Sequence, residues 1–195
     1  MKKIYIYFAV LLILGISAGI YYFTDYRQSK MEFPADISMQ NQEGNTYNFR
    51  EMKPKVRLLE FMYTQCPDIC PTTTFEMQKL RDRLAAKNVF GDKIEFITVT
   101  INPEKDTEKV LDEYIKTFKI NKTEGWDVLR GSSADTQKLA NQFNFQYRDN
   151  GTGQFVHTSA TYLLNQQNAV IKVFGMGKGK FDEDKVYKKI MNELY

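Results

Sequence analysis

The sequence predicts an α/β protein in which helices flank a central mixed β-sheet, preceded by one N-terminal membrane-spanning helix. Three observations support this prediction. Apolar stretches of strand length alternate with stretches whose apolar residues recur at helical spacing, as they do in α/β domains. The last two strand-like stretches are joined by a short polar turn, which adds an antiparallel pair to the sheet. An uncharged run of 20 residues, Ile4 to Phe23, precedes all of these stretches.

The uncharged run is long enough to cross a lipid bilayer. At about 1.5 Å per helical residue it spans about 30 Å, the thickness of the hydrocarbon core. A cleaved signal peptide is the competing interpretation, but its apolar segment usually has about 7–15 residues and ends before a polar mature sequence. Here Ser17, Ala18 and Gly19 are followed by further apolar and aromatic residues. We therefore predict an uncleaved, single-pass anchor over residues 1–23.

The charges around the anchor predict its orientation in the cell membrane. Lys2 and Lys3 precede the apolar run, which places the N-terminus on the cytoplasmic side and the rest of the chain on the extracytoplasmic side. Residues 24–31 are then a short polar tether, and residues 32–195 are the folded domain. The chain is 43% hydrophobic and 14% aromatic, which is enough to bury a core.

The domain is expected to begin with a hairpin, in which Ile37–Met39 and Thr46–Phe49 flank a turn at Asn41–Asn45. The elements expected after it are a buried strand at Val56–Tyr63, a helix at Thr72–Lys87, a strand at Ile94–Ile101, a helix capped by Asp106 or Thr107, a strand at Trp126–Leu129, a helix from Ser132 or Ser133 through Phe143, strands at Thr161–Leu164 and Val170–Phe174, and a helix capped by Asp182. This order is that of a thioredoxin-like fold with one inserted helix and strand.

Charge and composition exclude two classes of function. The net charge is +3, and two of those charges belong to Lys2 and Lys3. Because binding to a nucleic-acid backbone needs a concentrated basic surface, we predict no nucleic-acid partner. The chain has only 2 Cys and 1 His. A structural zinc site made of these residue types needs four ligands, so one chain cannot form it.

The two cysteines, Cys66 and Cys70, lie where a core strand is expected to give way to a helix. Four residues apart in a first helical turn, they would present both sulfurs on one face, where the helix N-terminus favours thiolates. Pro71 is compatible with this turn because its missing N–H has no intrahelical partner there. Two buried cysteines without a function are the alternative, which the prolines after both cysteines argue against. The spacing favours joint binding of a metal and also allows a redox-active disulfide.

His157 follows the glycine-rich segment Asn150–Gly153 and precedes a strand that begins near Ala160. A lone histidine in a loop is usually a surface or capping residue. In a thioredoxin-like sheet, however, this region faces the start of the cysteine helix. Two thiolates and one imidazole suit Cu(I), and with an added oxygen or water they can also hold Cu(II). We therefore predict Cys66, Cys70 and His157 as ligands of one copper ion.

Three segments of the chain resemble one known family. They are Phe61–Pro71, which reads FMYTQCPDICP, Thr98–Thr107, which reads TVTINPEKDT, and His157–Leu163, which reads HTSATYL. Together with the N-terminal anchor, they resemble the Sco/SenC family of cytochrome c oxidase copper-assembly proteins over nearly the entire chain. The cysteine segment is the specific part of the match, and the other two support it.

The resemblance implies a thioredoxin-like fold and copper bound by Cys66, Cys70 and His157. It also implies delivery of copper to the binuclear centre of oxidase subunit II, with an upstream copper donor or thiol reductant as a second partner. One position departs from the family pattern, because Asn102 stands where the family usually has Asp. If that acid tunes the copper site or a docking surface, metal affinity or partner choice differs here.

Three functions remain open for the same residues. A copper metallochaperone would use all three ligands. A thiol-disulfide oxidoreductase would use Cys66 and Cys70 as a redox pair, in which one cysteine attacks a substrate disulfide and the other resolves the mixed disulfide, while His157 is dispensable. A redox or copper sensor would hold the metal without passing it on. The ligand set and the anchor favour the metallochaperone.

Overall fold

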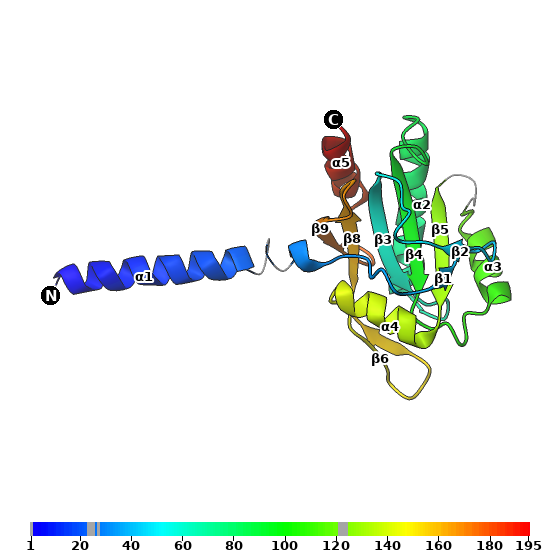
Figure 1. The fold of residues 1–195 in the computed structure, drawn as a ribbon, viewed down its shortest axis with the longest axis horizontal. Helices are drawn as coiled ribbons and strands as arrows, with labels where there is room; N and C mark the ends of the chain where they lie inside the picture. The colour runs from blue at the N-terminus through cyan, green and yellow to red at the C-terminus, as the bar shows by residue number, and fades with distance from the viewer. Residues whose placement is uncertain (1, 23–25, 27, 121–124) are drawn as a thin grey trace.

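The computed structural model describes residues 2–22, 26, 28–120 and 125–195 (Figure 1), so Phe23 and part of the predicted tether at 24–31 lie outside it. The helices are α1 (Lys2–Tyr21), η2 (Gln28–Lys30), α2 (Ile69–Ala85), α3 (Glu108–Thr117), α4 (Ser133–Gln142) and α5 (Glu183–Leu194). The strands are β1 (Met39–Gln40), β2 (Thr46–Tyr47), β3 (Val56–Met62), β4 (Ile94–Thr100), β5 (Trp126–Gly131), β6 (Tyr147–Asp149), β7 (Phe155–His157), β8 (Ala160–Leu164) and β9 (Val170–Gly175).

The main sheet is mixed, as the sequence predicts. In the described part of the chain its strands lie in the order β2-β1-β5-β4-β3-β8-β9. Strands β3, β4 and β5 are parallel, whereas β8 runs antiparallel to both β3 and β9. The predicted N-terminal hairpin is present, and β1 pairs with β5 so that the hairpin extends the sheet at one edge. Helix α4 crosses one face of the sheet in Figure 1, and α2 packs against α5.

The central strand β3 leads directly to the cysteine segment. All seven of its residues are buried, because strands flank it on both sides and helices cover the sheet. Its parallel pairing with β4 places Met62 opposite Thr100. The segments that follow the two strands therefore leave the sheet at the same edge, where Tyr63 to Cys66 lies beside residues 101–106.

The structure corrects one expected helix start and identifies the caps of two other helices. Helix α2 begins at Ile69, not at Thr72, so Pro71 falls within its first turn as expected. Thr107, not Asp106, caps α3 by accepting a hydrogen bond from the Val110 N–H. For the last helix the expected cap is confirmed, because Asp182 accepts from the Lys185 N–H.

A second hairpin was missed altogether. Strands β6 and β7 pair with each other in a two-stranded sheet that is separate from the main one. From the sequence this region was expected to be a loop, because strands of only three residues give little periodic signal. The Asn150–Gly151 pair between them is a typical hairpin turn signal and could have indicated it. His157 therefore lies at the end of a strand and not in a loop.

The N-terminal helix stands apart from the domain in Figure 1. Within the described residues, it is the one helix whose length and composition would allow it to cross a membrane, with a mean hydropathy of 2.2 over Lys3–Tyr21. None of that stretch is buried inside the protein. Such a helix suits either a membrane anchor or a signal sequence.

Candidate metal centre

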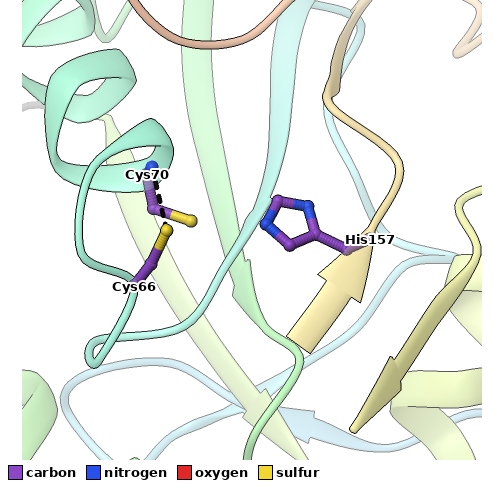
Figure 2. Close-up of side chains that lie close together, drawn as sticks. All are labelled: Cys66, Cys70 and His157. Carbon is purple, nitrogen blue, oxygen red and sulfur yellow. Dashed lines mark hydrogen bonds between the residues drawn. The ribbon is translucent and has the colours of Figure 1, made fainter. Parts of the chain in front are cut away.

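The three predicted ligands come together although they lie far apart in the chain. Cys66 is in the turn after β3, Cys70 is in the first turn of α2, and His157 ends β7 (Figure 2). Their sulfur and ring-nitrogen atoms all lie within 4.8 Å of one another. Figure 2 shows the imidazole with one ring nitrogen facing the two sulfurs. The fold thus brings together all the cysteine and histidine side chains of the chain.

Cys66 does not occupy the helical position expected from the sequence. It lies before α2, in a turn closed by a hydrogen bond of 3.2 Å from its own N–H to the Tyr63 carbonyl. Its sulfur accepts a hydrogen bond of 3.3 Å from the Cys70 N–H, one of the free donors at the start of α2. The Asp68 side chain, at the capping position, accepts no such backbone bond. The Cys66 sulfur therefore takes over part of the capping role at this helix end.

The two thiols differ sharply in acidity. Hydrogen bonding from the Cys70 thiol lowers the pKa of Cys66 to about 4, with His157 and backbone N–H groups adding to the effect against the cost of burial. The same hydrogen bond, together with burial, raises the pKa of Cys70. At neutral pH Cys66 is a thiolate and Cys70 keeps its proton. Cys66 is also the more accessible of the two, so it is the nucleophile that the sequence alone did not identify.

His157 is oriented by its neighbours. Its Nδ1 lies 2.9 Å from the Thr158 carbonyl, which can only accept, so Nδ1 carries a proton and Nε2 is the nitrogen left to face the sulfurs. The ring stacks on Phe145 at 5.7 Å between centroids and meets the edge of Tyr63 at 6.0 Å. A hydrogen bond with Cys66 raises the pKa of His157, against the opposing effect of burial.

This donor set fits a soft metal ion. Ligands bound at about 2.0–2.3 Å around one ion lie about 4 Å from one another, so the separations found here require little movement. Thiolate and imidazole donors suit copper better than they suit magnesium or calcium. A cavity of about 270 Å³ has Cys66 and His157 in its wall. A second cavity of about 670 Å³ also has His157 in its wall, so the imidazole can be reached from solvent.

The cysteine turn is braced from the neighbouring strand. The carboxylate of Asp106, which is fully buried, accepts hydrogen bonds from the N–H and hydroxyl of Thr64 and from the hydroxyl of Thr100. Asn102, the position that departs from the family pattern, is also buried, and its Nδ2 has no hydrogen-bond partner among the described residues. Neither side chain lines the cavity beside the cysteines.

Strand β3 also carries a buried carboxyl group that was not expected from the sequence. Glu60 is fully buried, and its carboxyl oxygens accept hydrogen bonds from the hydroxyls of Thr74 and Thr98. Burial raises the pKa of Glu60 to about 8. The group is therefore mostly protonated at neutral pH. An acidic residue in the middle of a strand expected to be buried was the available signal for it.

The acidity difference leads to the first prediction. In the metal-free chain, iodoacetamide should alkylate Cys66 much faster than Cys70 at pH 7, because only Cys66 is a thiolate. Its rate should stay constant from about pH 8 to pH 5 and fall only as the pH approaches the pKa of about 4. Mass spectrometry of the alkylated peptides measures both rates.

Two variants control this measurement. Cys70→Ala removes the S–H donor, so the pKa of Cys66 should rise and its alkylation at pH 5 should slow. In Cys66→Ala, the remaining Cys70 is buried and should stay unreactive at pH 7. Equal alkylation of both sulfurs in the wild-type chain would contradict the assignment. On mild oxidation the same thiolate should form an intramolecular disulfide with Cys70.

The chain matches the SCO1/SenC family over residues 26–194. It is 28% identical over 152 residues to the SCO1 protein homolog of Bacillus subtilis, covering 75% of this chain and 76% of that protein. It is 30% identical over 140 residues to a SCO2-like protein of Rickettsia typhi, covering 69% of this chain and 66% of that protein.

A crystal structure of a SCO1/SenC family lipoprotein from Bacillus anthracis superposes with a TM-score of 0.75 at 23% identity, covering 85% of this chain and 96% of that one. Arabidopsis thaliana ScoI with copper bound superposes with a TM-score of 0.70 at 22% identity, covering 84% and 98%. These likenesses confirm the predicted thioredoxin-like fold.

Proposed function

The chain belongs to the SCO1/SenC family, and on that premise we propose that it is a membrane-anchored copper metallochaperone. It binds copper through Cys66, Cys70 and His157 and assists assembly of the binuclear copper centre of cytochrome c oxidase subunit II. The observation that carries the proposal is the convergence of these three side chains, whose donor atoms lie within 4.8 Å of one another.

Copper is the cargo in this proposal and not a permanent cofactor. Two similar solved structures, those of ScoI from Arabidopsis thaliana and from Bradyrhizobium japonicum, have copper bound, which supports the choice of metal. Cu(I) is satisfied by the two sulfurs, so Cys70 releases its proton when it binds. Cu(II) prefers nitrogen and more ligands, so the imidazole of His157 matters most for that oxidation state.

The proposed location is the extracytoplasmic side of the cell membrane. Residues 1–23 form the anchor, residues 24–31 the tether, and residues 32–195 the copper-binding domain. The apolar helix over Lys3–Tyr21 and the two lysines at positions 2 and 3 support this arrangement. Outside the cytosol the Cys66–Cys70 pair can cycle between dithiol and disulfide, because no cytosolic reducing pool acts on it. The partners are then subunit II and an upstream copper donor or thiol reductant.

A second candidate function is thiol-disulfide exchange with the cysteines of the same subunit. The observation that favours it is the acidity of Cys66 beside a protonated Cys70. The Cys66 thiolate would attack a substrate disulfide, and one substrate sulfur would leave as a thiolate. Cys70, after losing its proton, would attack Cys66 and release the second substrate sulfur. The substrate gains two electrons, and the chain keeps the disulfide. A role as a redox or copper sensor would use the same residues.

The two candidate functions predict different behaviour of His157→Ala. In cells that lack their own copy of this protein, the full chain should restore cytochrome c oxidase activity, and Cys66→Ser, Cys70→Ser and His157→Ala should all fail. The histidine variant should keep its dithiol–disulfide interconversion but lose Cu(II) affinity by orders of magnitude. Oxidase activity and oxidase-bound copper in membranes are the measurements.

Arg148→Ala is the matched control, because Arg148 is an exposed residue on the other strand of the same hairpin. The chain with this substitution should restore full oxidase activity. Full rescue by His157→Ala, with both cysteine variants inactive, would decide for thiol-disulfide exchange. Failure of all three variants, with the control active, supports copper handling through three ligands.

A further inference from the structure

The metal ligands sit on two parts of the fold that share no strand pairing. The cysteines follow β3 of the main sheet, whereas His157 belongs to the separate β6–β7 hairpin. Among the described residues, no strand of that hairpin pairs with the main sheet. Only Thr158 and Ser159 connect His157 to β8 of the main sheet, so the backbone holds one end of the hairpin. Side-chain contacts between the two parts then adjust the distance from the imidazole to the sulfurs.

Tyr63 contacts both parts. It directly follows β3, is only 2% exposed, and its carbonyl accepts the hydrogen bond that closes the Cys66 turn. At the other end of the same residue, its hydroxyl accepts a hydrogen bond of 3.3 Å from the N–H of Phe155, two residues before His157. The backbone of Tyr63 thus bonds to the turn that carries Cys66, and its side chain bonds to the strand that carries His157.

The ring of Tyr63 strengthens this link. Its centroid lies 5.2 Å from that of Phe155 and 6.0 Å from that of His157, with the rings edge to face in both pairs. The same ring lines the cavity beside the metal centre. Phe145 also stacks on the imidazole of His157, but its apolar side chain cannot form a hydrogen bond to the cysteine turn. Besides the ligands themselves, Tyr63 is therefore a described residue whose hydrogen bonds join the cysteine turn to the hairpin.

We propose that Tyr63 is a positioning residue that sets the place of His157 relative to Cys66, and so decides whether the centre offers three ligands or only two. This inference rests on the proposed function of copper binding. Loss of the Tyr63 hydroxyl leaves the Phe155 N–H without its partner and loosens the hairpin beside the cysteines. Cu(I), which two sulfurs satisfy, is little affected, whereas Cu(II) loses a well-placed nitrogen. Tyr63 thereby raises the preference of the centre for Cu(II) over what the two cysteines alone provide.

The test uses the full chain in detergent with the variant Tyr63→Phe, which removes only the hydroxyl. Cu(II) affinity should fall about 10-fold or more, the usual range for groups that orient a metal ligand. Nitrogen coupling in the Cu(II) electron paramagnetic resonance spectrum should weaken, and Cu(I) affinity should stay unchanged. Hydrogen exchange in the metal-free chain should be faster over residues 155–157.

Tyr162→Phe is the matched control. Tyr162 is also 2% exposed, and its described ring contacts are with Phe61 and Phe143 and not with a metal ligand, so the same change there should alter none of these readouts. Wild-type Cu(II) affinity and spectrum in Tyr63→Phe would overturn the inference while leaving the proposed function standing. If the wild-type chain bound no copper, the proposed function would fail. Unchanged hydrogen exchange over residues 155–157 in Tyr63→Phe would then overturn the link between turn and hairpin as well.

Discussion

Replacing either Cys66 or Cys70 with Ser is expected to abolish tight Cu(I) binding, from about one copper per chain to none that withstands a competing chelator. A serine hydroxyl is a harder donor than sulfur and stays protonated at neutral pH, so it cannot replace a soft thiolate. One sulfur and one imidazole would then remain, which is too few soft donors to hold Cu(I) tightly. Competition against a chromogenic Cu(I) chelator, with the full chain reduced beforehand, measures the loss.

The matched control is Thr72→Ser, a change in the same first stretch of α2 that keeps the hydroxyl donating to Asp68. Its Cu(I) affinity should equal that of the wild-type chain. Wild-type affinity in Cys66→Ser or in Cys70→Ser would mean that the copper site lies elsewhere, because every cysteine of the chain is in this centre.

The second large effect concerns stability and comes from Glu60. Burial raises the pKa of its carboxyl group from 4.5 to about 8, so the folded chain holds this proton over a pH range in which the unfolded chain has lost it. The resulting stabilisation is complete below about pH 4.5 and is lost as the pH rises to about 8. At 1.36 kcal/mol per pKa unit, the loss is on the order of 5 kcal/mol.

Glu60→Gln is expected to remove this pH dependence, because an amide does not titrate and can still accept from Thr74 and Thr98. Between pH 5 and 8 the free energy of unfolding of the wild-type chain should fall relative to that of the variant, because the opposing effect of the low pKa of Cys66 is the same in both chains. Urea unfolding of the metal-free, reduced chain at several pH values gives both curves. Glu51→Gln, at an exposed position, serves as control and should follow the wild type. Parallel curves for wild type and Glu60→Gln would refute the assignment of the effect to this residue.

Most of the main sheet and the identity of the three converging residues could be predicted from the sequence. The strands Val56–Met62 and Ile94–Thr100 are each seven residues long and rich in apolar and β-branched or aromatic side chains, which indicates buried strands. Cys66, Cys70 and His157 could be singled out because the chain contains no other cysteine or histidine. For these residues, counting and the order of elements were sufficient.

What the sequence could not predict depends on contacts between distant segments. The acidity of Cys66 arises from a hydrogen bond to its partner thiol, and the spacing alone treats the two sulfurs as equivalent. The hydrogen bond between Tyr63 and Phe155 joins residues 92 positions apart, so no local sequence pattern could indicate it. The hairpin of β6 and β7 is too short for a periodic signal, so only its Asn150–Gly151 turn marks it.

The separation of this hairpin from the main sheet has a consequence for how the protein can vary. Within the described residues its two strands pair as strands only with each other, so a substitution there leaves the ladder of β3, β4 and β8 intact. The global free energy of unfolding, which the buried strands dominate, should then be largely independent of how long copper stays bound at the proposed centre. The strength of copper binding and the stability of the fold can therefore be altered independently, the first through residues 147–157 and the second through the core.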